Sequence, residues 1–89
     1  MKRIDLFEKA IADAKQALSA APYMFPLESV ISQLQYLIDL EKEMVVDKSA
    51  LLTVTIGQIA ARDIDDFDPR LGELLHEVSA QVRQMTGSR

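Results

Sequence analysis

The sequence contains no cysteine, a single histidine and no long run of apolar residues. The absence of cysteine excludes a disulfide scaffold, a thiol nucleophile and a thiolate metal site, and it fits a reducing compartment. No stretch approaches the ~20 apolar residues that a membrane-spanning helix needs. Acidic and basic side chains interrupt the N-terminal MKRIDLFEKA, which argues against a secretory signal peptide. These absences predict a cytoplasmic protein without a membrane partner.

Basic residues are too few for a nucleic-acid-binding protein. Fourteen acidic residues outnumber ten basic ones and give a net charge of −4, so the positive surface that attracts phosphates is missing. An acidic chain favours cationic partners instead. Glycine and proline occur three times each and no low-complexity tract is present, which is typical of a globular protein. We expect residues 1–89 to form a single helical domain that buries roughly 60–65% of its unfolded surface.

Apolar residues recur at spacings of three and four through the first half of the chain, which is the pattern of amphipathic helices. The first helix is expected over residues 4–21, with Asp5 and Glu8 resembling a capping box at its start. The second helix is expected over about residues 27–44, because the apolar positions continue to that point and Pro26 suits the first helical position.

The third helix is less regular in sequence. Asp47 or Ser49 can cap it, and apolar residues at helical spacing continue to Ala60. The segment LLTVTI, residues 51–56, is rich in β-branched residues and could pass for a strand. A single strand would find no partner elsewhere in the chain, so a helix is predicted. Gly57 within this helix is expected to let another helix approach closely.

The fourth helix has clear start and stop signals. Asp68 supplies a side-chain acceptor at the N-cap position, and Pro69 follows at the first helical position. The apolar stripe then runs to Met85, and Gly87 is placed to end the helix. Four amphipathic helices joined by short connections predict an all-α fold, a small antiparallel helical bundle.

The connection between the first two helices carries an unusual amount of apolar surface. Pro22 and Pro26 bracket Tyr23, Met24 and Phe25, and they disfavour a continuous helix through this segment. The preferred interpretation is that the aromatic side chains fold back over the core. The alternative is that one of them anchors a partner, because aromatic residues dominate binding hot spots.

Four carboxylates crowd into the stretch ARDIDDFDPR, at Asp63, Asp65, Asp66 and Asp68. Spacing excludes a calcium loop, because Phe67 would stand at the third ligand position of a loop that starts at Asp63. A weaker magnesium site made by two of the acids stays open, but no glycine-rich phosphate loop accompanies it, and we expect no metal. Capping and the helix dipole need only one or two of these acids. Because four like charges repel one another, a docking surface for a cationic partner is the alternative to a solvated connector.

No constellation for catalysis is evident. Glu73 and His76 form an E-x-x-H pair, but a di-iron site needs a second such motif and His76 is the only histidine. His76 is therefore interpreted as a partly exposed residue beside the apolar stripe. The serines have no histidine at local spacing to activate them, and a paired-carboxylate hydrolase would need a cleft that a small bundle hardly offers. We expect a protein that is not an enzyme and has no cofactor.

Several short segments, in matching order and spacing, resemble a known family. They are QLQYL at residues 33–37 and DKSALLTVTIGQIAARDIDDFDP at residues 47–69. In these segments the chain resembles the immunity proteins that protect bacteria from type VI secretion effectors, above all the small cytoplasmic immunity protein paired with an NAD(P)+ glycohydrolase toxin. The resemblance extends over about residues 33–75. It implies an all-α, non-enzymatic protein that binds the toxin domain and occludes its active site.

The resemblance and the charge pattern together suggest a contact surface. A toxin that consumes NAD(P)+ must bind phosphates, so its cleft is expected to carry arginine and lysine. The acidic segment could cover that cleft in place of substrate. The side chains expected to contact the toxin are Arg62, Asp63, Asp65, Asp66, Arg70, Gln33, Gln35, Tyr36, Tyr23 and Phe25. For Tyr36, a place at the edge of the core is an equal alternative.

Other functions stay open on the sequence alone. The toxin could instead be a nucleotide pyrophosphokinase that drains ATP, with this chain still acting as its immunity protein. The chain could also be a homo-oligomeric helical adaptor whose acidic segment binds a regulatory partner. A homodimer is compatible with each of these functions, and a small carboxylate enzyme is the third class of alternative.

Overall fold

The structure is a computed structural model that describes residues 2–87, and this part of the chain contains helices and connections without a strand. Four α-helices carry the fold, with a 3-10 turn and a π-helical turn between them. Their bounds are Arg3–Ala20 for α1, Pro26–Glu41 for α2, Ser49–Thr53 for η1, Ile56–Ile59 for α3, Ala60–Ile64 for η2 and Pro69–Met85 for α4. The predicted all-α bundle is confirmed. None of the helices described is long and apolar enough to cross a membrane.

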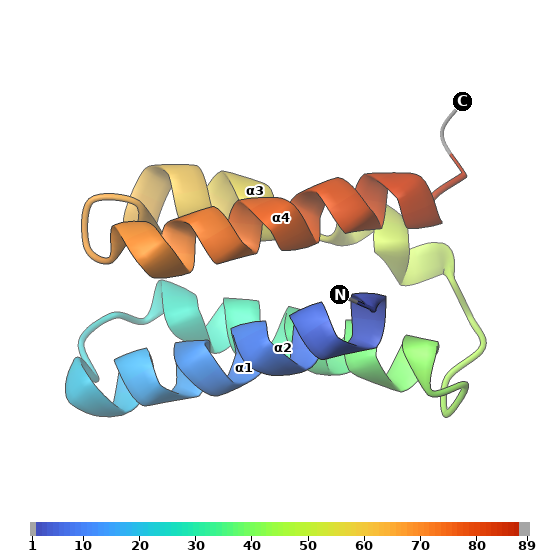
Figure 1. The fold of residues 1–89 in the computed structure, drawn as a ribbon, viewed down its shortest axis with the longest axis horizontal. Coiled ribbons are helices and arrows are strands. Elements are labelled where there is room, and N and C mark those ends of the chain that lie inside the picture. Colours follow the sequence, from blue (N-terminus) through green and yellow to red (C-terminus); the bar gives the residue numbers. More distant parts are fainter. Residues whose placement is uncertain (1, 88–89) are drawn as a thin grey trace.

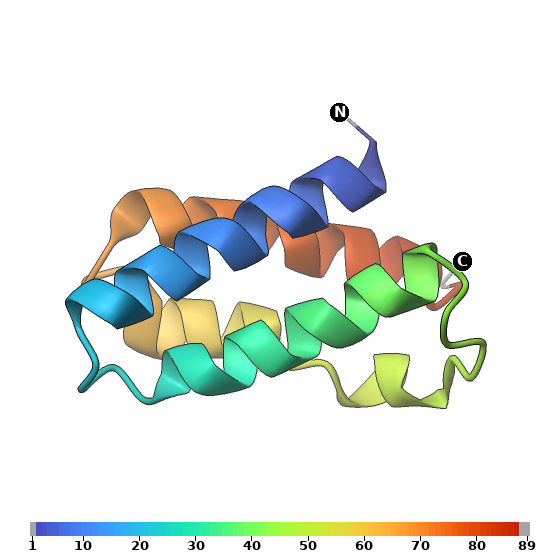
Figure 2. The same cartoon turned by 90° about the horizontal axis from the view of Figure 1, so that it is seen from below.

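The helices form two antiparallel pairs that pack on one another. In Figure 1, α1 and α2 make the lower layer and α3 and α4 the upper layer, and each helix runs opposite to the one before it. Because the direction alternates, the α1–α2 and α3–α4 connections meet at one end of the bundle, on the left of Figures 1 and 2. We call this the turn end, residues 21–25 and 62–70, which include the last residues of η2 and the start of α4. The opposite end, with residues 42–55, the start of α1 and the end of α4, is the loop end.

Apolar side chains fill the space between the two pairs. Among the described residues no polar or charged side chain is buried. The largest fully buried side chains are Phe7, Leu27, Leu34, Leu37, Ile56, Ile64, Leu75, Val30 and Val78. Fully burying a side chain of this kind contributes roughly 1.5–3 kcal/mol relative to leaving it exposed. The apolar stripes predicted from helical spacing therefore form the core, and they provide most of the driving force for folding.

The capping box predicted for α1 is wrong, although the helix begins within one residue of the predicted position, and the predicted start of α2 is confirmed. Lys2 is the N-cap of α1 and makes no side-chain cap, so Asp5 and Glu8 form no capping box. Asp5 lies inside the first turn instead, where a carboxylate favours the helix dipole. In α2, Pro26 occupies the first helical position, as expected from its fixed φ and missing N–H.

Both predicted boundaries of α4 are confirmed. The side chain of Asp68 accepts a hydrogen bond from the Leu71 N–H at 3.2 Å, which satisfies one of the unpaired donors at the start of the helix. The helix ends at Met85, and Gly87 beyond it adopts a positive φ of 71°.

The single third helix predicted from Asp47 or Ser49 onward is wrong. The chain forms the 3-10 turn η1, then an extended Val54 (φ −69°, ψ 125°), and only then α3 and η2. The β-branched residues of the TVT segment, residues 53–55, lose side-chain freedom inside a helix, which explains the break. The strand-like signal in LLTVTI thus marks an interruption between two helical segments.

The second helix also ends earlier than predicted. It ends at Glu41, with Lys42 as its C-cap, and Glu43 follows in the left-handed region with a φ of 60°. The N–H groups of Met44 and Val45 both donate to the Asp39 carbonyl, at 2.9 and 3.3 Å. Hydrogen bonds of this kind to a carbonyl of the last turn close a helix and turn the chain away from its axis.

Two side chains of α2 tie the long connection to the body of the bundle. Gln33 Oε1 accepts from the Thr55 N–H at 2.7 Å, and Gln33 Nε2 donates to Thr55 Oγ1 at 3.1 Å and to Ser29 Oγ at 3.0 Å. The Tyr36 O–H donates to the Asp47 carbonyl at 2.9 Å. The start of α3 and the start of η1 are therefore both held against α2.

The beginning of η1 is ordered by a local carboxylate. The Ser49 N–H donates to Asp47 Oδ1 at 2.9 Å. This backbone hydrogen bond, aided by the Ser49 side chain, holds the pKa of Asp47 below its ordinary value. Asp47 thus supports the turn although Lys48 is the N-cap residue of η1.

The second pair of helices packs closely at two glycines. A Cβ on Gly57 would lie 2.6 Å from Ser79 Oγ of α4, so the close approach predicted for Gly57 is confirmed. A Cβ on Gly72 would overlap the carboxylate of Asp65 and lie 3.1 Å from the Asp65 Cα. Gly72 therefore lets the connection after η2 lie directly on α4, a role that the sequence did not reveal.

The hydrogen bonds of Gln33 lead to a stability prediction with a matched control. Gln33→Ala should lower the free energy of unfolding by about 1 kcal/mol, because the Thr55 N–H and hydroxyl lose their partner. Gln35→Ala on the same helix should change it by less than about 0.5 kcal/mol, because Gln35 bonds only to Asp39 one turn away, at 3.0 Å. Urea denaturation measures both changes, and amide exchange at residues 55–59 should rise only in Gln33→Ala. Equal effects of the two substitutions would contradict the tie.

Candidate partner-binding surface

The α1–α2 connection exposes its two aromatic side chains at the turn end. Tyr23 is 70% exposed and Phe25 is 69% exposed, while Met24 between them packs against the core. The preferred expectation that the aromatics cover the core is therefore wrong. The turn is short and directs Ala21, Met24 and Leu27 inward, which leaves Tyr23 and Phe25 pointing to solvent.

The four carboxylates of the acidic stretch have different surroundings. Asp63 Oδ2 lies 2.9 Å from the guanidinium of Arg62, and Asp65 Oδ2 lies 3.0 Å from His76 Nε2. Asp68 caps α4. Asp66 is exposed, and within residues 2–87 its side chain makes no hydrogen bond or ion pair inside the fold. Three of the four acids thus have a partner inside the fold, so the internal repulsion expected for the stretch is smaller than the sequence suggested.

The pair formed by Asp65 and His76 fixes the path of the connection before α4. His76 is partly exposed, as predicted, with 44% of its side chain accessible. Its partner Asp65 was not predicted, since the two residues are eleven positions apart and meet only because the connection folds back over Gly72. A glycine in the first turns of α4 was the one signal in the sequence that pointed to such a contact.

Two further residues complete the turn end. Phe67, which was not predicted as a contact residue, is 37% exposed between Asp66 and Asp68. Arg70 is exposed at the start of α4 and lines a shallow groove of about 260 Å³ together with Gln16 and Ala20 of α1. The turn end therefore combines three aromatic side chains with charges of both signs.

The candidate residues on α2 lie apart from this surface. Gln33 and Tyr36 are half-buried and make the hydrogen bonds to Thr55 and Asp47 described above. Tyr36 also packs against the core, which supports the core-edge interpretation for this residue. Gln35 is exposed and bonds to Asp39. The structure thus brings Tyr23, Phe25, Arg62, Asp63, Asp65, Asp66 and Arg70 toward one end and leaves Gln33, Gln35 and Tyr36 along the side of α2.

The acidic residues do not converge on a common point. Among residues 2–87 no group of three or more histidine, aspartate or glutamate side chains could hold a metal ion. Each of the paired acids is engaged by a different neighbour, namely Arg62, His76 and the start of α4. The turn end therefore places exposed aromatic side chains beside charges of both signs, a combination that also occurs at protein interfaces.

Comparison with known proteins connects this fold to an immunity family. The model of the family described as Tsi6 matches residues 2–84. The immune protein Tsi6 of Pseudomonas aeruginosa (strain PAO1) is 32% identical over 77 residues, which cover 86% of this chain and 82% of the relative. The resemblance to immunity proteins of type VI secretion effectors, based on residues 33–75, is thereby confirmed and extended to the N-terminal helix.

A solved structure supports the same relationship in three dimensions. A chain in the structure of Tse6 in complex with Tsi6 matches all of this chain and 96% of its own length, with 30% sequence identity and a TM-score of 0.87. Sequence and structure therefore agree over the full helical bundle. Because both a family model and a relative above 30% identity span most of its length, this chain belongs to the Tsi6 family.

Proposed function

We propose that this chain is the immunity protein of a type VI secretion effector, which binds the toxin domain of that effector in the cytoplasm and blocks it without catalysis of its own. The observation that carries the proposal is the fold match to the structure of Tse6 in complex with Tsi6, with a TM-score of 0.87 over the whole chain. A bundle of this shape has thus been observed together with an effector. The name of the curated relative, immune protein Tsi6, describes the same role.

The toxin that we assign to this chain is an NAD(P)+ glycohydrolase, on the strength of the sequence resemblance in residues 33–75. Such an enzyme holds the phosphates of its substrate with arginine and lysine side chains. The chain has a net charge of −4, and the acidic stretch contributes four carboxylates against the nearby Arg62 and Arg70. An immunity protein that presents negative charge to a cationic cleft gains both a faster encounter and a defined orientation.

We place the principal contact at the turn end. Tyr23 and Phe25 are exposed there, and large exposed aromatics are the residue type that most often carries binding energy at an interface. Asp66 supplies a carboxylate without an internal partner in the part of the chain described. The α2 candidates Gln35 and Tyr36 would join the contact only if the toxin extends along the side of the bundle.

The turn end is well prepared for tight binding because its backbone is already held in place. The Asp65–His76 pair, the close contact over Gly72 and the Asp68 cap all restrain residues 65–68 in the free protein. A surface that is ordered beforehand loses less conformational entropy on association. Protection of a cell requires nanomolar affinity or better, about −12 kcal/mol. A smaller loss of conformational entropy on binding helps the protein to reach that affinity.

The proposed reaction and the proposed inhibition can be tested together. The C-terminal toxin domain of the cognate effector should cleave NAD+, and an equimolar amount of this chain should abolish the cleavage, because the cleft is covered. Nicotinamide release measures the activity, and an unrelated NAD+-cleaving enzyme serves as the control that must stay active. A toxin that consumes ATP and is still inhibited would overturn the assigned reaction alone. An active toxin in the presence of this chain would overturn the immunity function.

The unpaired acid at the turn end should contribute to binding through charge. Asp66→Lys is expected to weaken toxin binding roughly tenfold or more, mostly through slower association and a reduced dependence on salt. Glu77→Lys makes the same charge change on the exposed surface of α4, away from the turn end, and should have a much smaller effect. Surface-based binding kinetics at two salt concentrations separate the two variants. Similar losses in both would mean that only net charge matters.

The exposed aromatics should contribute through burial. Tyr23→Ala and Phe25→Ala are each expected to weaken toxin binding by about 1–3 kcal/mol, mostly through faster dissociation, with little change in thermal stability because both side chains are exposed. Met44→Ala at the loop end is the matched control, since Met44 is 73% exposed. Calorimetric titration with the toxin domain measures the effect. Unchanged affinity in both aromatic variants would remove the turn end from the interface.

A further inference from the structure

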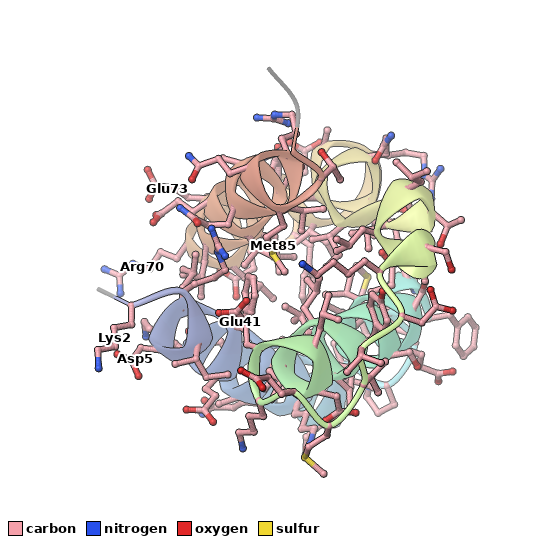
Figure 3. All side chains as sticks on the ribbon, turned by 90° about the vertical axis from the view of Figure 1, so that its right-hand side faces the viewer. Lys2, Asp5, Glu41, Arg70, Glu73 and Met85 are labelled. Atoms are coloured by element: carbon pink, nitrogen blue, oxygen red, sulfur yellow. The ribbon has the colours of Figure 1, made fainter. Side chains whose placement is uncertain are left out.

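The loop end carries exposed apolar side chains and a hollow beside them. The hollow has a volume of about 500 Å³, and its apolar wall includes Leu40, Leu51 and Met85. Figure 3 looks onto this end and shows that Glu41 of α2 and Met85 of α4, which both line the hollow, lie near the middle of the view. Leu40 and Leu51 are buried beneath the hollow, whereas Met85 is half-buried.

Apolar side chains project next to this hollow. Val46, on its rim, is 81% exposed. Leu52 is 82% exposed and lines a second, smaller hollow that shares Lys48, Leu51 and Met85 with the first. Exposed apolar side chains that gather around a depression are characteristic of a surface that is covered by a partner. The loop end therefore carries both projecting apolar side chains and a hollow in which projecting side chains of a second molecule would fit.

The rim of the hollow carries charges of both signs. Arg3 is 3.6 Å from Glu41 and also donates to Gln81 Oε1 at 3.1 Å. Glu43 and Lys48 line the same hollow, and neither forms an ion pair within residues 2–87. Two cations and two anions make this patch neutral, although the chain as a whole carries −4. Repulsion between two copies would thus be weakest at the loop end.

Glu43 occupies a position that disfavours it. It follows the C-cap of α2 with a φ of 60°, where glycine is the usual residue because it has no Cβ to strain the left-handed conformation. Retaining a glutamate at such a position lowers the stability of the monomer, and strained residues of this kind cluster at functional sites. The glutamate places a carboxylate on the rim of the hollow, which a glycine could not do.

We propose that two copies of this chain associate through their loop ends about a two-fold axis. In such a contact the same patch is used twice, so it must be complementary to itself. Val46 and Leu52 of each copy would enter the hollow of the other, and Lys48 of each would face Glu43 of the other. The bundle is 25 by 24 Å across, so an end-to-end contact is smaller than the ~800 Å² that each partner buries in a standard interface, and the dimer is expected to be reversible.

An end-to-end dimer keeps the turn ends free. The loop end and the turn end lie at opposite ends of the longest dimension, which is 33 Å. The two turn ends would therefore point away from each other, and each copy could still meet a toxin. The dimer does not depend on the proposed immunity function, because it follows from the loop end alone.

A charge-exchange experiment tests the dimer. Sedimentation equilibrium from about 1 to about 500 µM should show reversible dimerisation of the unaltered chain, since interfaces of this size range from micromolar to tighter affinity. Glu43→Lys and Lys48→Glu should each be monomeric, because a two-fold contact then juxtaposes like charges twice. An equimolar mixture of the two variants should dimerise again, because every pair across the interface is once more of opposite sign. Native mass spectrometry should find only the mixed dimer.

A second variant separates association from stability. Glu43→Gly should raise the melting temperature of the monomer, since it relieves the left-handed strain, and should weaken the dimer at least tenfold. Glu77→Lys controls for the change in net charge and should leave both unchanged. All of these variants alter exposed side chains, and circular dichroism verifies that they fold.

Three results would overturn the proposal. The chain could stay monomeric throughout the concentration range. It could form a dimer that survives both Glu43→Lys and Lys48→Glu, which would place the contact elsewhere. Finally, the equimolar mixture of the two variants could stay monomeric, which would show that Glu43 and Lys48 do not face each other across a two-fold contact. Failure of toxin binding at the turn end alone leaves the dimer untouched, so this proposal and the immunity function can be judged separately.

Discussion

The structure depends on one apolar seam, the contact between the α1–α2 pair and the α3–α4 pair. No polar or charged side chain is buried within it among the described residues, so the seam provides cohesion but no directional interaction. Contacts of this kind specify a helical bundle while leaving the exact position of short segments loosely determined. Directional hydrogen bonds at the edges of the seam fix those positions. They join Gln33 to Thr55, Tyr36 to the Asp47 carbonyl, and Asp65 to His76.

Topology distributes these edge interactions between two ends of different character. The turn end is made by two short connections, and the close packing over Gly72 and the Asp68 cap restrain one of them. The loop end is made by a long connection that interrupts the helical pattern, with a left-handed Glu43 and a 3-10 turn in place of regular helix. A restrained end suits a surface that must recognise one partner tightly. An irregular end with a hollow suits contact with a second surface that shares its shape.

Much of the fold was predictable from sequence because its determinants are local. Helical spacing located α1, α2 and α4, and the proline and aspartate signals at Pro26, Asp68 and Pro69 located two helix starts to the residue. The third helical segment was not predictable in the same way, since the β-branched run of residues 53–55 competes with helical spacing. The Thr55 N–H is also bound by Gln33, a side chain from another helix, which no local pattern reveals. The end of α2 was placed too late for a related reason, because apolar residues continue past the point where the chain turns.

The candidate surface was predictable only in part, because its residues come from segments that are brought together only by folding. The exposure of Tyr23 and Phe25 depends on which turn residues face the core, and the placement of the aromatic turn beside the acidic stretch follows from the antiparallel arrangement.

The ion pairs of the turn end change how the acidic stretch should be understood. Mutual repulsion of four free carboxylates would favour any cationic partner without distinguishing among them. With Asp63, Asp65 and Asp68 held by neighbours, the stretch instead presents a fixed arrangement of charge, in which Asp66 and Phe67 project from a restrained backbone. Fixed charges contribute more to orientation and selectivity than to raw affinity. In the proposed complex, burial of Tyr23 and Phe25 would therefore supply most of the affinity, and the acidic stretch would determine which cationic surface is accepted and in which orientation.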